Sequence, residues 1–133
     1  MNIKIYAIGK VKDKNQLNAI KEYDKRLGRY CKIEMILVKN KEMLLKKLSY
    51  KSYVIKVSTE GELFTSEGLA EKIKTLGVSG TSDMAIVYSE EDIKWDEHLA
   101  VSKMDMSLGM FMTILFEQIY RGYRIIHNQA YHK

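Results

Sequence analysis

Hydrophobic and polar residues alternate along the chain in a pattern that predicts strands and helices in regular succession. Short apolar runs rich in β-branched residues predict strands at 3–8, 32–38, 52–57 and 84–88, with a short fifth strand within 98–104. Apolar residues three and four positions apart predict helices at 13–29, 41–48, 66–76 and 107–126. This succession is typical of an α/β fold, with a mostly parallel sheet and helices on both of its faces.

The loops after the carboxyl ends of the strands are the expected place for a ligand. Sheets of this class bind ligands there, at the point where the strand order reverses. Polar residues at 58–61 predict a turn that closes the third strand. We therefore expect a site built from three loops, at 58–62, 89–93 and 102–108.

The predicted last helix is hydrophobic on nearly every side. Its apolar residues are Leu108, Met110, Phe111, Met112, Ile114, Leu115, Phe116, Ile119, Tyr120, Tyr123, Ile125 and Ile126. Such a helix must be covered all round, and a domain of 133 residues can hardly do so alone. We expect a homodimer that uses this helix. The alternative is a central helix sheltered by its own sheet.

One polar stripe runs along the same helix. Glu117, Arg121 and Arg124 are four and three positions apart and share that stripe. The spacing of four favours a salt bridge between Glu117 and Arg121 within the helix. The alternative is a pair of arginines that binds phosphate.

Composition limits the classes of function. The length suits a single domain over residues 1–133, and the net charge of +5 allows an RNA partner without requiring one. Without an uncharged apolar run of about 18 residues or a signal-peptide pattern at 1–10, we expect a cytoplasmic protein. Cys31 is the single cysteine, which excludes an internal disulfide and a multi-cysteine zinc site.

Several segments resemble the sequence of a known protein family, which is information beyond the spacing of apolar residues. They are Glu117–Ile126 with the ending Tyr131-His132-Lys133, Leu99–Met104, Ile8-Gly9-Lys10 with Lys12, and Ser66-Glu67 with Leu69-Ala70. Together they resemble the ribosomal RNA large subunit methyltransferase H family of the SPOUT class, over the whole chain. The C-terminal match is the most specific of the four.

The resemblance implies a SPOUT fold with a trefoil knot at the C-terminal end and a homodimer built on the last helix. It implies methyl transfer from S-adenosylmethionine to N3 of a pseudouridine in the 23S rRNA of an assembled ribosome. It implies no metal, and we expect neither a membrane nor DNA as a partner.

The resemblance also implies a set of site residues. The cofactor pocket would involve Val57, Glu90, Ser102, Lys103, Met104, Asp105, Met106 and Ser107. Catalysis would involve His132, Arg121 and Tyr131, with His132 as a base because a histidine titrates near pH 6.5. Arg124 and Lys133 would contact RNA.

The chain departs from the family pattern around the presumed cofactor loops. Ser89 and Glu90 replace a glycine pair, Ile93 a later glycine, and Ser58 an aspartate. In the family, a threonine, an apolar residue, a proline and a histidine stand where this chain has residues 105–108. The chain also departs from the family pattern at Met112 and at residues 127–130. Two hypotheses therefore stay open. One is an active methyltransferase, and the other is a divergent paralogue. The paralogue would keep the knotted dimer, bind cofactor weakly or not at all, and serve as an RNA-binding or protein-interaction module.

Overall fold

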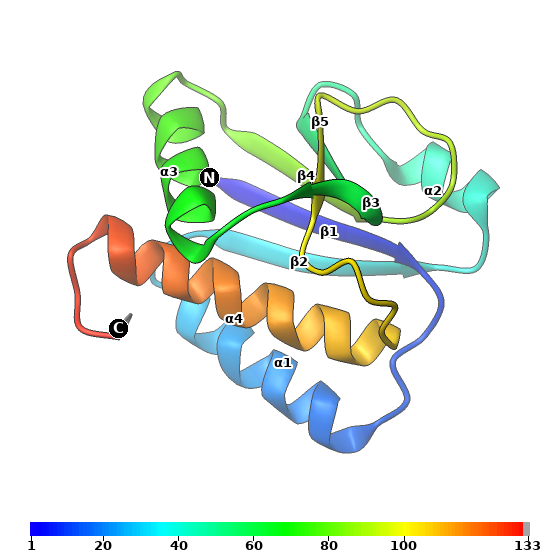
Figure 1. Ribbon diagram of the computed structural model, residues 1–133, viewed down its shortest axis with the longest axis horizontal. Helices are drawn as coiled ribbons and strands as arrows, with labels where there is room; N and C mark the ends of the chain where they lie inside the picture. The colour runs from blue at the N-terminus through cyan, green and yellow to red at the C-terminus, as the bar shows by residue number, and fades with distance from the viewer. Residues whose placement is uncertain (132–133) are drawn as a thin grey trace.

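The computed structural model describes residues 1–131, and within them the predicted strands and helices alternate (Figure 1). The strands are β1 (Asn2–Ile8), β2 (Lys32–Val38), β3 (Tyr53–Leu63), β4 (Asp83–Tyr88) and β5 (Glu97–Ala100). The helices are α1 (Lys14–Leu27), α2 (Lys41–Lys47), α3 (Ser66–Val78) and α4 (Leu108–Ile126). None of these helices combines the length and hydrophobicity needed to cross a bilayer.

The sheet is parallel throughout, with the strand order β2-β1-β4-β3-β5. The chain returns from β3 to β4, beside β1, and then crosses back over to β5 on the outer side of β3. The direction of strand addition therefore reverses around β3 and β4. The carboxyl ends of these strands are where a ligand site is expected in a sheet of this class.

Helices cover both faces of the sheet, which confirms the predicted α/β architecture. The larger core lies under α1, α3 and α4 and includes Ile5, Leu115 and Ile119. The smaller core lies under α2 and includes Tyr6 and Leu44. In Figure 1 the helices α1 and α4 run side by side along the larger core.

The helix starts are fixed by polar side chains, since the chain contains no proline. Asp13 accepts a hydrogen bond from the backbone N–H of Gln16 at 2.9 Å, and Ser107 accepts one from Met110 at 3.2 Å. Asn40 and Thr65 cap α2 and α3 in the same way. These N-caps satisfy amide groups that a helix leaves free at its start.

The predicted turn at 58–61 is wrong, because β3 continues through it to Leu63. The strand bulges between Val57 and Glu62, so that both residues lie opposite Leu99 of β5. Gly61 makes this approach possible: a Cβ atom there would lie 2.2 Å from the carbonyl oxygen of Leu99. The polar residues of the bulge resembled a turn because a bulge, like a turn, leaves backbone groups outside the regular ladder.

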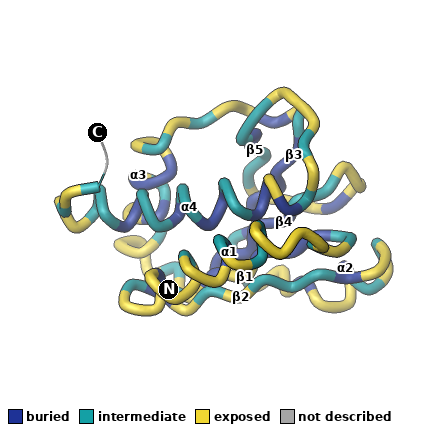
Figure 2. Tube along the Cα trace, turned by 90° about the horizontal axis from the view of Figure 1, so that it is seen from below, coloured by how far each residue is buried: buried dark blue, intermediate teal, exposed yellow. Residues whose placement is uncertain are grey.

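Helix α4 is sheltered mainly by its own chain. Its buried residues are Gly109, Phe111, Met112, Leu115, Phe116, Ile119, Gly122 and Tyr123. They pack between α1, α3 and the sheet, and buried and half-buried positions alternate along the helix (Figure 2). The sheltered helix, which the sequence left open as an alternative, therefore accounts for most of its hydrophobic surface. Met110 is 47% exposed on the remaining side.

Candidate functional site

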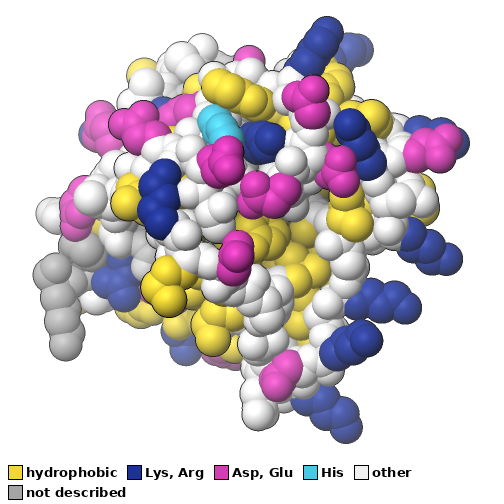
Figure 3. Space-filling view, turned by 45° about the vertical axis from the view of Figure 1, so that its right-hand side comes forward, with side chains coloured by type: hydrophobic (Ala, Val, Ile, Leu, Met, Phe, Trp, Pro, Cys, Tyr) yellow, Lys and Arg dark blue, Asp and Glu magenta, His cyan; other side chains and the backbone are white. Residues whose placement is uncertain are grey.

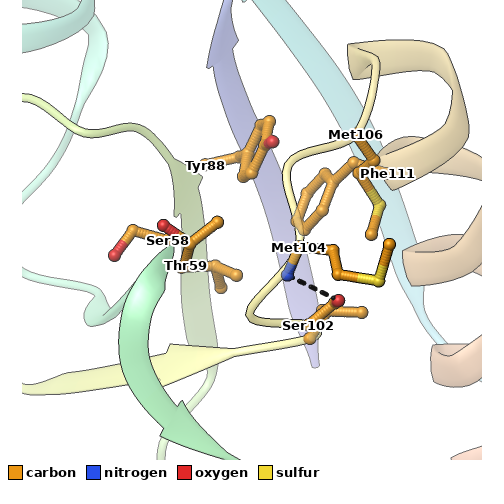
Figure 4. Close-up of a pocket in the computed structure, with 9 residues that line it drawn as sticks. Ser58, Thr59, Tyr88, Ser102, Met104, Met106 and Phe111 are labelled. Atoms are coloured by element: carbon orange, nitrogen blue, oxygen red, sulfur yellow. Dashed lines mark hydrogen bonds between the residues drawn. The ribbon is translucent and has the colours of Figure 1, made fainter.

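Two of the three predicted ligand loops, 58–62 and 102–108, meet at a pocket beside the bulge of β3 and the carboxyl end of β4, which we call the ligand pocket (Figure 4). It is lined by Val57, Ser58, Thr59, Tyr88, Val101, Ser102, Met104, Met106 and Phe111. Its empty volume is about 200 Å³. The pocket therefore lies at the reversal of strand order, as the α/β pattern predicts.

An aromatic pair forms one wall of the ligand pocket. Tyr88 is the last residue of β4, and Phe111 lies in the first turn of α4. Their rings are stacked with centroids 3.7 Å apart and planes inclined by 10°. Burial raises the pKa of the Tyr88 phenol, and the nearby carboxylates of Glu90 and Asp105 raise it further. Tyr88 is therefore a neutral ring at physiological pH.

The serines of the ligand pocket are already hydrogen-bonded within the chain. Ser58 Oγ lies 2.6 Å from His98 Nε2 and accepts a hydrogen bond from the backbone N–H of Glu60 at 3.2 Å. These bonds tie the bulge of β3 to β5. Ser102 Oγ accepts from the backbone N–H of Met104 at 3.0 Å and so shapes the loop between β5 and α4.

A second depression adjoins the ligand pocket, and we call it the acidic cleft. It is lined by Ile8, Tyr88, Ser89, Glu90, Glu91, Asp105 and Leu108, with an empty volume of about 690 Å³. Tyr88 belongs to both cavities. Figure 3 shows acidic side chains around a hollow lined with hydrophobic side chains on this side of the molecule. The combination suits a ligand that is part apolar and part cationic.

The structure brings most of the predicted cofactor residues together. Val57, Ser102, Met104 and Met106 line the ligand pocket, while Glu90 and Asp105 line the acidic cleft. Two predicted residues point elsewhere. Lys103 Nζ donates to the carbonyl oxygen of Gly61 at 2.5 Å, and the Ser107 side chain caps α4.

Sequence reasoning missed Tyr88, Phe111 and Val101 as lining residues, and it included Ser58 and Thr59 only as part of the predicted loop 58–62. Tyr88 could have been found, because it is the last residue of a strand that reads as buried on both faces. Phe111 was assigned only to the hydrophobic surface of the last helix. Among residues 1–131, no group of three or more histidines, cysteines and carboxylates is placed to hold a metal ion.

Three of the predicted catalytic and RNA-binding residues, Arg121, Arg124 and Tyr131, gather at the other end of α4, in what we call the tyrosine–arginine cluster. Its members are Tyr23, Tyr30, Glu117, Tyr120, Arg121, Arg124 and Tyr131. Arg121 Nε lies 3.1 Å from Glu117 Oε2, which confirms the predicted salt bridge. The Arg121 guanidinium also lies 4.9 Å from the ring centre of Tyr131.

Tyr131 is bound inside the tyrosine–arginine cluster as a hydrogen-bond donor. Its hydroxyl donates to Glu117 Oε2 at 3.1 Å and lies 3.3 Å from the Tyr23 hydroxyl. Burial, followed by these hydrogen bonds and the Glu117 charge, raises the pKa of Tyr131 well above its ordinary value. In this arrangement the Tyr131 hydroxyl stays protonated at neutral pH. It acts as a hydrogen-bond donor and does not act as a base.

Arg124 holds the end of the chain against α1. It donates to the Tyr30 hydroxyl at 3.3 Å and to the carbonyl oxygen of Ala130 at 2.8 Å. Phe111 and Arg124 are separated along α4 by roughly 20 Å, at a rise of about 1.5 Å per residue. A single chain therefore does not bring Arg121, Arg124 and Tyr131 to the ligand pocket. His132 and Lys133 lie outside the described residues.

Comparison with known proteins gives consistent matches over the full chain. A family model described as "Predicted SPOUT methyltransferase" matches residues 1–132. A protein of Thermoanaerobacter sp. (strain X514) named ribosomal RNA large subunit methyltransferase H 1 is 47% identical over 133 residues, covering all of both chains. Proteins named ribosomal RNA large subunit methyltransferase H from Shouchella clausii and Alkaliphilus oremlandii are 39% and 38% identical, again with both chains fully covered.

Proposed function

The chain belongs to the SPOUT methyltransferases, within the ribosomal RNA large subunit methyltransferase H family, and on that premise we propose that it methylates N3 of a pseudouridine in the RNA of the large ribosomal subunit. The observation that carries this proposal is the ligand pocket at the reversal of strand order, in a chain that aligns end to end with proteins named for this activity. The trefoil knot at the C-terminal end and a cytoplasmic location are part of the same proposal.

The methyl donor of the proposal is S-adenosylmethionine, which supplies a methyl group already activated by its sulfonium charge. Val57, Met106 and Phe111 offer an apolar surface that suits a nucleoside, and Ser102 and Met104 offer the backbone of a tight loop. The rim of the acidic cleft carries Glu90, Glu91 and Asp105. These side chains therefore fit a ligand with an apolar base at one end and a positive charge at the other.

The carboxylates of the acidic cleft make the local electrostatic potential negative. Their negative charge attracts a sulfonium and repels phosphate, so the RNA backbone has to approach from another side. The tyrosine–arginine cluster is the basic surface that suits RNA, since it combines guanidinium groups with aromatic rings. Arg124 of this cluster is a proposed RNA contact, and Lys133, outside the described residues, is another.

A homodimer would bring the two surfaces together. The ligand pocket and the tyrosine–arginine cluster lie at opposite ends of α4, too far apart to serve one reaction within a chain. A second copy packed in the opposite sense on α4 would place its cluster beside the pocket of the first. The exposed side chains of Met104 and Met110, at 76% and 47%, lie next to the pocket and suit such a contact.

Within that composite site the roles of the chain's own residues follow from their chemistry. Holding the acceptor nitrogen in line with the donor is the main requirement of the reaction. Arg121 would position the RNA, and Tyr131 would turn its hydroxyl from Glu117 to donate a hydrogen bond to the acceptor base. His132 is the proposed base for the imide proton, because its ordinary pKa lies near neutrality.

Calorimetric titration with S-adenosylmethionine tests donor binding directly. We expect a one-to-one complex at micromolar concentrations. Complementation of a strain that lacks the rRNA methylation, with mass spectrometry of the RNA, then identifies the nucleotide. Binding without restored methylation would overturn the assigned substrate and leave the donor in place.

One observation favours the second candidate, a paralogue without effective cofactor binding. Only about 10 Å³ of the ligand pocket is room for the centre of a water molecule, whereas sites for small molecules span roughly 300–1,000 Å³. The same titration separates the candidates, because the paralogue would give no heat at high micromolar donor while still binding ribosomal RNA.

A further inference from the structure

The Tyr88 side chain is the partition between the ligand pocket and the acidic cleft, since it lines both cavities. In Figure 4 its ring points from β4 toward the ring of Phe111, which comes from α4. The two rings stack nearly parallel at 3.7 Å. A displacement of this one ring would open the ligand pocket toward the acidic cleft.

The stack has the geometry with which an aromatic side chain binds a nucleobase. Aromatic pairs usually stack offset or meet edge to face with centroids about 4.5–7 Å apart, so the Tyr88 and Phe111 rings at 3.7 Å are closer and more nearly face to face than usual. A nucleobase can stack on an aromatic face in the same way. Tyr88 therefore lies where a purine ring stacked on Phe111 would lie. Phe111 is fixed in the core, at 1% exposed, while Tyr88 is only partly buried at the mouth of both cavities.

The Tyr88 ring is held by apolar packing at the edge of the larger core. Among residues 1–131, no hydrogen bond is made by its hydroxyl, and the stack with Phe111 is its one aromatic contact. The acidic cleft beside it has room for a phenol ring. The carboxylates of Glu90 and Asp105 at its border can accept a hydrogen bond from the displaced hydroxyl.

We propose that Tyr88 is a gate that occupies the adenine position of the ligand pocket, and that the methyl donor binds by displacing this ring into the acidic cleft and stacking its adenine on Phe111. The inference rests on the proposed function and adds to it the residues that select a purine. It also accounts for the small volume of the ligand pocket, because the gate fills the space that the base takes. Tyr88 competes with the ligand, whereas Phe111 binds it.

The two roles predict opposite effects of two substitutions. Tyr88→Ala removes the competing ring, so S-adenosylhomocysteine should bind about 3- to 10-fold more tightly and associate faster. Phe111→Leu keeps most of the core volume but removes the stacking surface, so binding should weaken by about 10-fold, mainly through faster dissociation. Tyr88→Phe should resemble the wild type, because the ring and not the hydroxyl closes the pocket.

Calorimetry and stopped-flow measurements with S-adenosylhomocysteine as the probe check these signs. Tyr50→Ala is the matched control, since it removes an exposed tyrosine that lines neither cavity, and its affinity should equal that of the wild type. Thermal unfolding of each variant verifies that it folds. Weaker binding by Tyr88→Ala, in step with Phe111→Leu, would mean that the pair is only core packing and would overturn the gate.

The experiment also separates the gate from the proposed function. Binding by the wild type with no gain in Tyr88→Ala rejects the gate and leaves the methyl donor assigned. Binding by Tyr88→Ala alone supports the gate in its strongest form. Failure of the wild type and of every variant to bind the probe rejects the donor itself, and the gate with it.

Discussion

Glu90 stands where the family pattern has a glycine, and the structure shows where its carboxylate lies. Its carboxylate accepts a hydrogen bond from the backbone N–H of Thr59 at 3.4 Å and lies on the rim of the acidic cleft. The side chain therefore borders the site without filling the ligand pocket. Its contribution to the binding of a cationic ligand is therefore electrostatic.

Glu90→Gln keeps the hydrogen bond to Thr59 and removes the charge. We expect S-adenosylmethionine to bind about 2- to 5-fold more weakly, the range for an exposed charge pair, with the difference shrinking at about 1 M salt. Calorimetry at low and high salt measures the effect, and Glu71→Gln on the exposed side of α3 is the control. Tighter binding by the variant would show that Glu90 obstructs the donor.

Cys31 gives a second prediction at this scale, through pH. Burial raises the pKa of its thiol from 9.0 to about 11, and the neighbouring Tyr123 hydroxyl partly offsets that rise. Between these two values the unfolded chain loses a proton that the folded chain keeps, so stability falls as pH rises through this window. The loss approaches about 2–3 kcal/mol near pH 11.

Denaturant unfolding at pH 8 and pH 10.5 checks this expectation, with Cys31→Ala as the comparison. The variant lacks the thiol and should lose less stability between the two pH values than the wild type. Tyrosines add their own pH dependence to both proteins, and the difference between the two removes most of it. Equal losses in both would contradict a raised thiol pKa.

Among the elements, the pairing of β3 with β5 depends on Gly61. Gly61→Ala places a Cβ atom against the backbone of Leu99, which cannot swing away as a side chain would. We expect a loss of about 1–3 kcal/mol in the free energy of unfolding, measured with urea. Gly77→Ala in α3 meets no atom within 4 Å and should instead stabilise the protein by about 0.5–1 kcal/mol.

The same pair of strands shows how far sequence patterns reach. The bounds of strand Lys32–Val38 were predicted correctly, because a continuous run of β-prone residues indicates a strand from its first residue to its last. The bulge of β3 was missed, since its polar residues carry the composition of a turn. Only the backbone of β5, some 40 positions away, makes them part of a strand.

For the whole molecule, the α/β pattern located the loops of the site, the family likeness named residues near and within them, and tertiary contacts decided which side chains face it. Met104 and Met106 were expected from the loop they occupy, whereas Lys103 between them turns to the carbonyl oxygen of Gly61. The stack of Tyr88 on Phe111 joins a strand end to a helix start. The spacing of apolar residues within one element gives no information on contacts between elements, so this contact could not be predicted from the sequence.

The arrangement of α4 leads to the last prediction, which concerns the assembly. The ligand pocket uses the start of the helix and the tyrosine–arginine cluster uses its end, so the proposed reaction needs both ends in one place. A composite site in a symmetric dimer takes its pocket from one copy and its cluster from the other. Two variants damaged at different ends can then complement each other.

Ser102→Trp fills the pocket, and Arg121→Ala removes a cluster cation. Each homodimer should be nearly inactive. After subunit exchange about half of the dimers are mixed, and each of these has one intact site, so methyl incorporation into ribosomes should recover to about a quarter of the wild-type level. Mass spectrometry of differently tagged copies verifies the exchange. Mixed dimers without activity would place both parts of the site in one chain, and in that case the tyrosine–arginine cluster would have to act on RNA far from the methyl donor.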